Sequence, residues 1–438
     1  MGDATLESPD PRRHAPSVAK LLDDARLRES ISRVGRSIVK DTARVVQQAV
    51  RQGELAPEEC VEAIIAAVPE HASSLRAVRN ATGVIVHTNL GRAPLSQAAV
   101  DALVAAAGHT DVEMDLASAR RAPRGRSTIA ALRRAAPEAE EVHVVNNGAA
   151  ALALAATALA SGREILLSRG EFVEIGDGFR IPELLTSTGA EIHEVGTTNR
   201  TRLEDYARAV GPRTGFILKI HPSNFTVRGF TSDVGLADLA TLGVPVVADI
   251  GSGLLVPDAL LPDEPDVSTA LNEGASLVIA SADKLLGGPQ AGLIFGSAAA
   301  VDALRRHPLA RALRVDKLTL AALEATLAGP RTPVRQALEL PLAELKERST
   351  RFAEALRGHG IDAQVIPAEA VVGGGGAPGV ALPSCAIALP SRLALPLRTG
   401  TPPVIGRVVR DRLLLDLRCV PQTDDELVLT AVVQAAVI

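Results

Sequence analysis

Six short apolar segments, separated by alanine-rich stretches, dominate the middle of the chain. The apolar segments are residues 141–145, 164–168, 191–195, 215–220, 244–249 and 276–281, and the intervening stretches expected to be helical are 149–160, 178–188, 203–210, 233–242 and 268–274. Strands that alternate with helices at this interval are typical of a mainly parallel sheet with helices on both faces, an α/β fold. Ligands of such sheets lie beyond the carboxyl ends of the strands, so the residues that follow each strand are the candidates for a site.

The chain of 438 residues is too long for one ordinary core and predicts two or three domains. A net charge of −5 gives no global attraction to nucleic acid, so we expect no DNA partner, and any polyanion must meet a local basic patch. Cys60, Cys385 and Cys419 lie far apart, which indicates neither a disulfide framework nor a metal site and fits a reducing cytoplasm. The longest apolar run is shorter than the ~20 residues of a membrane span, so we expect neither membrane insertion nor export.

One lysine follows an apolar strand in a glycine-containing loop. Lys284 comes after the apolar run 277–280 and before a second apolar run, 293–295. Burial disfavours the charged amine and can lower a lysine pKa to ~7–8, where the amine is nucleophilic enough to form a Schiff base. An exposed loop lysine is the alternative, but the chain keeps only six lysines among its 46 basic residues, and arginine forms no Schiff base. Lys219 is a rival that ranks lower, because it lies inside strand 215–220 rather than after it.

Two further strand ends complete a candidate cofactor site. Asn147, Gly148 and Ala149 open a helix, where free backbone N–H groups hold phosphates, although any strand-to-helix turn has this form. Asp249 ends an apolar strand before a glycine-rich turn and is either a helix cap or a cofactor ligand. An aspartate for the pyridine nitrogen, a phosphate turn and a lysine are the parts that pyridoxal 5'-phosphate requires. We therefore predict pyridoxal phosphate as the cofactor, held by Lys284, Asp249, Asn147, Gly148, Ala149, His221 and Ser223.

The N-terminal segment carries a basic helix face. Residues 1–16 are polar and predict a disordered tail, whereas residues 17–73 predict a small helical domain with a second helix over 57–68. Helical periodicity puts a set of apolar residues on one side, namely Ile31, Val34, Ile38, Val45 and Ala49. It puts a set of basic residues on the opposite side, namely Arg33, Arg36, Lys40, Arg44 and Arg51. This basic face is either simply solvated, as most charge runs are, or it contacts the phosphate backbone of a tRNA.

Motifs across residues 79–330 resemble those of one family, the bacterial selenocysteine synthases, or L-seryl-tRNA(Sec) selenium transferases. The motifs most specific to it are HTNLGR at 87–92 and DKLLGGPQAG at 283–292, and others are NNGAAAL at 146–152, KIHPSNFTVRGFT at 219–231 and ADIGSGLL at 248–255. The chain departs from the family pattern at Gly148, where a third asparagine is usual, and at Ala282, where glycine is usual.

The resemblance implies a fold-type-I pyridoxal phosphate enzyme, with a large domain over 74–330 and a small α+β domain over 331–438. It implies that Lys284 bonds to the cofactor and that Asp249 faces the pyridine nitrogen. It also implies an anionic pocket for the selenium donor, selenophosphate, made by Arg92, Arg311 and Arg314. Arg311 and Arg314 are three apart on an expected helix, so they would share one face, which either binds the anion or is simply solvated.

The activity that the resemblance implies is conversion of seryl-tRNA(Sec) to selenocysteinyl-tRNA(Sec) through a dehydroalanyl intermediate, by a large homo-oligomer, a decamer, whose N-terminal domain contacts the tRNA. Two alternatives stay open: a paralogous pyridoxal phosphate lyase acting on a small amino acid or sugar phosphate, and a tRNA-binding protein without chemistry. In the C-terminal part we expect a helix over 342–357, a hairpin that turns at 410–412 and a final helix. The glycine run 373–376 predicts a flexible loop, to which we assign no function.

Overall fold

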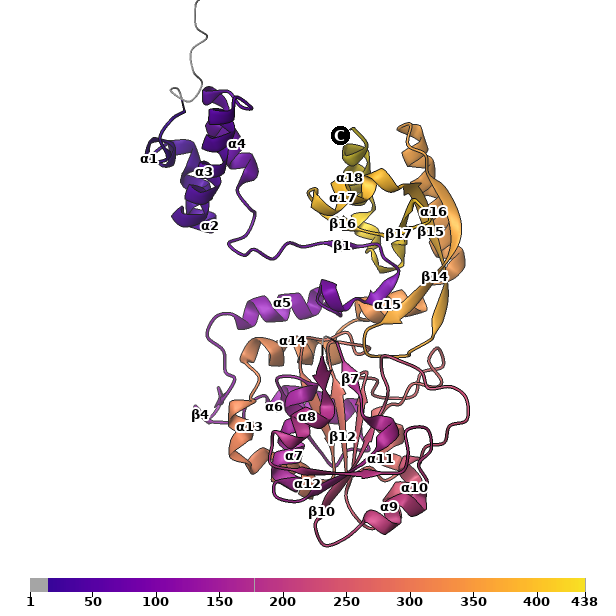
Figure 1. The fold of residues 1–438 in the computed structure, drawn as a ribbon. Coiled ribbons are helices and arrows are strands. Elements are labelled where there is room, and N and C mark those ends of the chain that lie inside the picture. The colour runs from indigo at the N-terminus through magenta and orange to yellow at the C-terminus, as the bar shows by residue number, and fades with distance from the viewer. Residues whose placement is uncertain (1–14, 177, 438) are drawn as a thin grey trace, which may run out of the picture. The chain divides into compact units, whose positions relative to one another are not determined.

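The computed structural model of the protein describes residues 15–176 and 178–437. Residues 1–14, which make up most of the predicted disordered tail, lie outside the described residues. The chain divides into two compact units between Ala77 and Val78 (Figure 1). Among the described helices, none is both long and apolar enough to cross a membrane.

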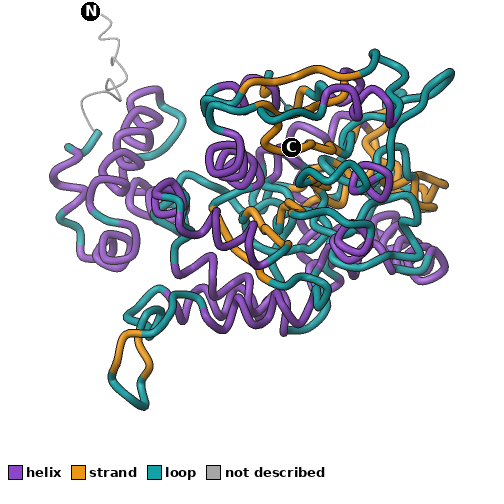
Figure 2. Tube along the Cα trace, turned by 90° about the horizontal axis from the view of Figure 1, so that it is seen from below, coloured by secondary structure: helices purple, strands orange, loops and turns teal. Residues whose placement is uncertain are grey.

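The N-terminal unit consists of helices and loops alone within its described part, residues 15–77 (Figure 2). Its α-helices are α1 (Val18–Leu22), α2 (Arg28–Val34), α3 (Arg36–Gln52) and α4 (Cys60–Ala67). Leu27, Val39 and Ile64 are fully buried in the core between them. A short 3-10 turn at Pro57–Glu59 runs into α4, which confirms the helix predicted over 57–68.

The prediction that residues 31–51 follow a single helical periodicity is wrong. Gly35, with a φ of 89°, separates α2 from α3, so a single helical register cannot run through the segment. Val45, predicted on the apolar side, is 72% exposed. The buried side of α3 consists of Val39, Ala43, Val46 and Val50.

The second unit contains a seven-stranded sheet, which confirms the predicted α/β core (Figure 1). Its strand order is β5 (Glu141–Val145), β13 (Gly292–Gly296), β12 (Leu277–Ser281), β11 (Val246–Gly251), β10 (Thr214–Ile220), β6 (Glu164–Ser168) and β9 (Glu191–Val195). All six predicted strands are present. β13 is antiparallel to both of its neighbours and the remaining pairs are parallel, so the sheet is mainly parallel.

Helices cover both faces of this sheet because its central strands are apolar on both sides. Along β12, Leu277 and Ile279 enter one core whereas Val278 and Ala280 enter the other, as the period of two in a strand requires. The first core includes α7 (Gly148–Ala160), α8 (Ile181–Thr186) and α12 (Ala298–Arg306), and the second includes α6 (Arg126–Ala135), α11 (Val267–Asn272) and α14 (Lys317–Ala328). The helix predicted over 178–188 is shorter than expected, because Phe179–Arg180 form the strand β8.

A five-stranded sheet organises the C-terminal part. Its order is β17 (Arg407–Val409), β18 (Arg412–Leu415), β15 (Ala381–Pro390), β14 (Gln364–Gly373) and β2 (Val84–Val86). The predicted hairpin is confirmed, since β17 and β18 are antiparallel and joined by Arg410 and Asp411, which both have positive φ. The two expected helices are α16 (Leu342–Gly358) and α18 (Asp425–Val437), which pack in one core.

The strand β2 comes from much earlier in the chain than the other four strands of this sheet. It pairs in parallel with β14, with Val86 opposite Gly373. Parallel strands end at the same edge of a sheet, so the HTNLGR segment that follows β2 lies beside the glycine run that follows β14.

Candidate active site

Lys284 lies in the connection between β12 and β13, at the edge of the sheet where the parallel strands end. Burial lowers the pKa of its amine; the Asp249 carboxylate opposes part of this shift, and the positive charge of Arg92 adds to it. Within the described residues, no carboxylate forms an ion pair with Lys284. The amine is therefore closer to neutral than that of an exposed lysine, as a nucleophile requires.

Asp249 lies in β11, the strand next to β12, and its Oδ1 accepts a hydrogen bond of 3.1 Å from the Gly251 N–H. This position within a strand rules out a role as helix cap. Burial raises the pKa of Asp249 to about 6, and attraction to Lys284, the Gly251 N–H and His221 offset only part of that rise. A buried carboxyl without a full positive partner is suited to receive a protonated ring nitrogen.

The turn at Asn147–Ala149 begins α7 directly after β5. Asn147 is the N-cap residue, and its Oδ1 accepts a hydrogen bond of 2.8 Å from the Ala150 N–H. A Cβ added at Gly148 would lie 2.8 Å from Ser281 Oγ, so this turn lies against the end of β12, three residues before Lys284. Because the first N–H groups of a helix have no partner within it, the turn is a candidate phosphate site.

His221 and Ser223 follow β10 and approach the same place. The His221 N–H donates a hydrogen bond of 2.9 Å to the Asp249 carbonyl oxygen. A Cβ added at Gly251 would lie 3.6 Å from Ser223 Oγ and also 3.6 Å from Lys284 Nζ. The ends of β10, β11 and β12 therefore converge around the Lys284 amine.

Arg92 closes the tight turn that the HTNLGR motif forms after β2. Its φ of 67° is in the left-handed region, and its N–H donates a hydrogen bond of 3.0 Å to the His87 carbonyl oxygen. Its guanidinium Nη1 lies 2.7 Å from Asp283 Oδ2, and Asp283 directly precedes Lys284. This ion pair holds the charge of Arg92 close to the Lys284 amine, where it contributes to the lowered pKa.

The prediction that Arg311 and Arg314 share one helix face is wrong. The helix α13 (Pro308–Ala312) contains Arg311 and ends before Arg314, which instead forms a backbone bridge with Val145. This bridge places the Arg314 backbone next to the start of the Asn147 turn. The Arg314 Nη1 lies 3.5 Å from Glu113 Oε1, and neither arginine has an ion pair with the Lys284 surroundings in the part of the chain that the structure describes.

The five basic residues predicted as a face of the N-terminal unit are all exposed. Three of them are engaged within this unit: Arg33 donates to the Pro69 and Glu70 carbonyl oxygens, Arg36 lies 3.4 Å from Asp23, and Arg44 lies 2.9 Å from Asp41. The remaining two, Lys40 and Arg51, have no ion pair or hydrogen bond from their side chains to other described residues.

Two parts of the site were not predicted. Gly373 ends the strand β14, whereas residues 374–376 form a loop, as expected. Gly375 and Gly376 are buried, and a Cβ at Gly375 would lie 2.6 Å from Lys284 Nζ. Glu264 has a side chain that is only 1% exposed and an Oε2 that lies 3.3 Å from His221 Nε2. The glycine run carried the only signal, since residues without side chains permit close backbone approach.

These residues fit pyridoxal phosphate. Within the described residues, two buried polar atoms near Lys284 have no hydrogen-bond partner, namely Ser252 Oγ and Glu264 Oε1. Buried polar atoms are normally paired, so such a group indicates a polar ligand. The start of α7 offers N–H donors for a phosphate, Asp249 offers an acceptor for a ring nitrogen, and Lys284 offers an amine for an aldehyde.

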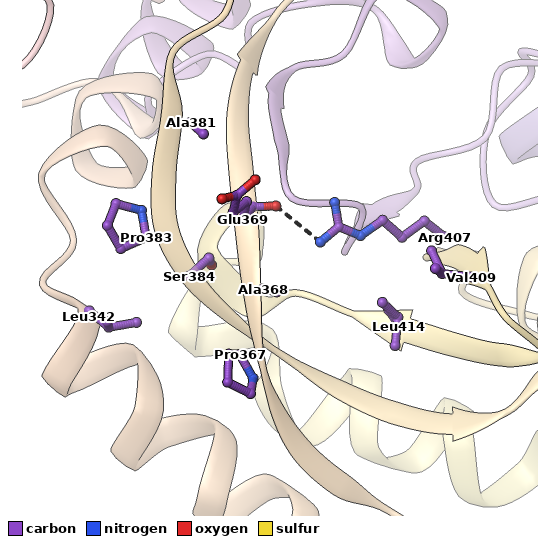
Figure 3. Close-up of a pocket in the computed structure, with 10 residues that line it drawn as sticks. All are labelled: Leu342, Pro367, Ala368, Glu369, Ala381, Pro383, Ser384, Arg407, Val409 and Leu414. Carbon is purple, nitrogen blue, oxygen red and sulfur yellow. Dashed lines mark hydrogen bonds between the residues drawn. The ribbon is translucent and has the colours of Figure 1, made fainter.

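A separate pocket of about 700 Å³ lies on the five-stranded sheet (Figure 3). Its lining comes from β14, β15, β17, β18 and the start of α16, and Arg407 donates a hydrogen bond of 3.0 Å to the Glu369 carbonyl oxygen there. None of its ten lining residues belongs to the predicted site, so this pocket is not the place where Lys284 and Asp249 meet.

Comparison with known proteins agrees with the geometry. A family model described as "L-seryl-tRNA selenium transferase" matches residues 78–421, and one described as "Selenocysteine synthase N terminal" matches residues 12–51. The L-seryl-tRNA(Sec) selenium transferase of Moorella thermoacetica is 46% identical over 387 residues, covering 83% of this chain and 82% of that protein. That of Hyphomonas neptunium is 41% identical over 439 residues, covering 93% of this chain and 95% of that protein.

Among solved structures, a D-glucosaminate-6-phosphate ammonia-lyase is similar, with a TM-score of 0.59 at 20% identity over 83% of this chain and 96% of that one. At this identity the likeness extends to the fold alone. The family models together match most of the chain. The alignments with the two relatives cover most of this chain and most of each relative. This chain therefore belongs to the L-seryl-tRNA selenium transferase family and is a pyridoxal phosphate-dependent transferase.

Proposed function

We propose that the enzyme converts L-seryl-tRNA(Sec) to L-selenocysteinyl-tRNA(Sec), with selenophosphate as the selenium donor. Its relatives are named as L-seryl-tRNA(Sec) selenium transferases. The observation that carries the proposal is the Lys284 amine, which is half-buried beyond the strand ends, has a lowered pKa and has no ion pair within the described residues. Asp249 supplies a carboxyl from the neighbouring strand β11, and Arg92 supplies a guanidinium from the turn after β2.

Pyridoxal phosphate would be held by Lys284 at its aldehyde, by Asp249 at its ring nitrogen and by Asn147, Gly148 and Ala149 at its phosphate, beside His221 and Ser223. When bound, the cofactor withdraws electrons from the α-carbon of the amino acid. The seryl α-amine would take the place of Lys284 at the aldehyde carbon, and the Lys284 amine freed in this way would accept the proton from the α-carbon, because a lysine whose pKa is lowered by burial accepts a proton near neutral pH.

The selenium donor is an anion, and we assign its binding to Arg92, Arg311 and Arg314. Arg92 supports this assignment, because its guanidinium is fixed by Asp283 immediately before Lys284. Guanidinium groups bind phosphate oxygens through paired hydrogen bonds, and fixed donors stabilise charge that develops during the reaction. Arg311 lies on α13, and Arg314 lies beyond the end of this helix, so the two side chains would bind the anion from different directions.

The tRNA would be bound by the basic residues of the N-terminal unit, Arg33, Arg36, Lys40, Arg44 and Arg51, which are exposed. With 2% aromatic residues, the chain offers little for base stacking, so recognition would rely on tRNA shape and backbone. We further propose that the enzyme works as a homo-oligomer, a decamer, and acts in the cytoplasm. All three cysteines are free, in line with a reducing compartment.

The substrate assignment is tested by binding of serine-charged tRNA(Sec) and ordinary serine tRNA to the full chain. We expect selective binding of the first. Equal, weak binding of both would contradict the proposal and favour a small-molecule substrate.

The assignment of tRNA contact to the N-terminal unit is tested by a variant with Lys40→Ala and Arg51→Ala. Binding should weaken, and the slope of log affinity against log salt should fall by about 1 for each phosphate that the variant no longer neutralises. Lys346→Ala in α16 is the matched control, since Lys346 is also an exposed helix lysine. An unchanged slope in the double variant would exclude these side chains from the tRNA interface.

A further inference from the structure

The segment 374–377, which we call the glycine loop, lies against the motifs that surround Lys284, and its residues 375–377 are buried. It begins at the end of β14, and the Gly374 N–H donates a hydrogen bond of 3.0 Å to the Val86 carbonyl oxygen of β2. A Cβ added at Gly376 would lie 3.1 Å from Leu285 Cδ1. The glycine loop is therefore held between the strand that precedes HTNLGR and the segment that contains Lys284.

Gly375 makes the closest approach. A Cβ at this position would lie 2.6 Å from both Cε and Nζ of Lys284, which is closer than real Cβ contacts come. Its φ of 92° is also in the region that favours glycine. No side chain fits here unless Lys284 moves, so the backbone of Gly375 forms one wall of the space around the amine.

Glu264 holds the end of this loop from a distant part of the chain. Its Oε2 accepts a hydrogen bond of 2.6 Å from the Ala377 N–H and lies 3.3 Å from His221 Nε2. Ala377 has a φ of 45°, which is unfavourable for a residue with a side chain and persists only where the surroundings impose it. The carboxylate is buried, and no lysine or arginine of the described residues pairs with it.

We propose that Glu264 is a positioning residue that holds the glycine loop against Lys284, and that the loop held in this way sets the space available beside the amine. The inference rests on the proposed role of Lys284 as the amine that receives the cofactor. It concerns how that amine is enclosed, and it adds Glu264 and Gly375 to the residues on which cofactor capture depends.

The first test is hydrogen exchange of the full-length, cofactor-free protein over residues 371–380. Glu264→Ala removes the acceptor of the Ala377 N–H, and exchange of that segment should become about 10- to 100-fold faster. Glu264→Gln keeps an acceptor oxygen, so exchange should stay close to that of the unchanged protein. Equal exchange rates in Glu264→Ala and in the wild-type protein would contradict the proposal that Glu264 holds the glycine loop.

The second test is the rate at which added pyridoxal phosphate is captured, followed by absorbance and by borohydride labelling of Lys284. Gly375→Ala should slow capture at least ~10-fold, since a side chain there displaces the amine. Gly379→Ala is the matched control: Gly379 has a φ of 81° in the same connection, but its Cβ would make only an ordinary contact of 3.4 Å with Thr226 Cγ2. An equal decrease in capture rate in both variants would contradict the proposal that the Gly375 backbone bounds the space around the amine.

The two tests separate this inference from the proposed function. Hydrogen exchange needs neither cofactor nor tRNA, so it reports on Glu264 even if the enzyme acts on another substrate. If borohydride labels no Lys284 in the unchanged protein, the proposed role of Lys284 fails, and with it the consequence drawn for Gly375. If a Glu264→Ala variant does not fold, Glu264→Met would replace it, because methionine also removes the acceptor of the Ala377 N–H but fills a similar volume.

Discussion

Two lysines near the carboxyl edge of the same sheet have opposite environments. Lys219, in β10, lies 2.8 Å from Glu171 Oε1 and 3.0 Å from Asp233 Oδ2. Burial alone would lower the pKa of Lys219, but these two carboxylates outweigh it and raise the pKa above the ordinary value. Lys284 is half-buried, as Lys219 is, yet the pKa of Lys284 is lowered, because Asp249 offsets only part of the cost of desolvation and Arg92 adds to it.

The difference teaches that burial by itself does not make a lysine reactive. A buried ammonium that is paired with carboxylates stays charged and serves the structure, whereas one that lacks a close partner shifts towards the neutral amine. The preference for Lys284 over Lys219, first based on position relative to a strand, thus has an electrostatic reason. Substitutions at and around the two lysines test that reason, from the largest expected effect to the smallest.

Replacing the two lysines should separate chemistry from structure. Lys284→Ala should lower the rate of selenocysteinyl-tRNA formation by ~10²–10⁴-fold or more, the usual contribution of one positioned proton-transfer group. Lys219→Met should leave the rate of the folded enzyme close to that of the unchanged protein. Single-turnover assays on cofactor-saturated protein measure both, and a comparable loss of rate in the two variants would contradict the comparison.

The same two positions should affect stability in opposite directions. Lys219→Met leaves Glu171 buried without its partner, and the free energy of unfolding should fall by about 3–5 kcal/mol. Lys284→Met removes an amine whose charge is poorly compensated, so the cofactor-free protein should be no less stable. Urea unfolding of cofactor-free proteins tests this, with Lys219→Met combined with Glu171→Gln expected to recover part of the decrease.

The carboxyl of Asp249, beside Lys284, should make the free energy of unfolding depend on pH. Burial raises the pKa of Asp249 from 3.8 to about 6, so the native state keeps this proton after the unfolded chain has released it. The free energy of unfolding of the cofactor-free protein should therefore fall by about 3 kcal/mol as pH rises from about 4 to about 6. Asp249→Asn should lack this component, and identical pH profiles for the two proteins would show that Asp249 is not buried as described.

Replacing Arg92 should have the smallest effect. It should change only the pH at which Lys284 becomes reactive. Arg92→Ala removes a positive charge that helps to lower the pKa of Lys284, so the pKa should rise. The rate of pyridoxal phosphate capture should then reach its plateau at higher pH. Arg213→Ala is the control, because Arg213 pairs with Glu191 at the surface. A profile that moves to lower pH in Arg92→Ala would contradict the assigned electrostatics.

Local patterns predicted the strands well because apolar runs report burial directly. All six predicted strands of the seven-stranded sheet are present, and the hairpin at Arg410 and Asp411 turns where expected. The pattern failed where a single residue broke the register, as at Gly35 between α2 and α3. It also failed at Arg314, since helical spacing alone does not show that α13 ends at Ala312.

The sequence predicted only those site residues that lie at strand ends or in recognisable motifs. Lys284 follows β12, Asp249 lies near the end of the neighbouring strand β11, and the Asn147 turn follows β5, which β13 separates from β12. These three strands run in the same direction, so their carboxyl ends lie at one edge of the sheet. The approach of Gly375 depends on β2 pairing with β14 across almost three hundred residues, and no local pattern reports such a pairing. Glu264 lies in a loop between β11 and α11, where a buried carboxylate cannot be told from an exposed one by sequence.

The most direct test of the role of Lys284 is to reduce the cofactor-loaded enzyme with borohydride and to map the labelled peptide by mass spectrometry. We predict visible absorption that borohydride abolishes, with the cofactor then attached to Lys284 and to no other lysine. Attachment at Lys219, or no attachment at all, would contradict the claim that incomplete compensation of buried charge selects the reactive lysine.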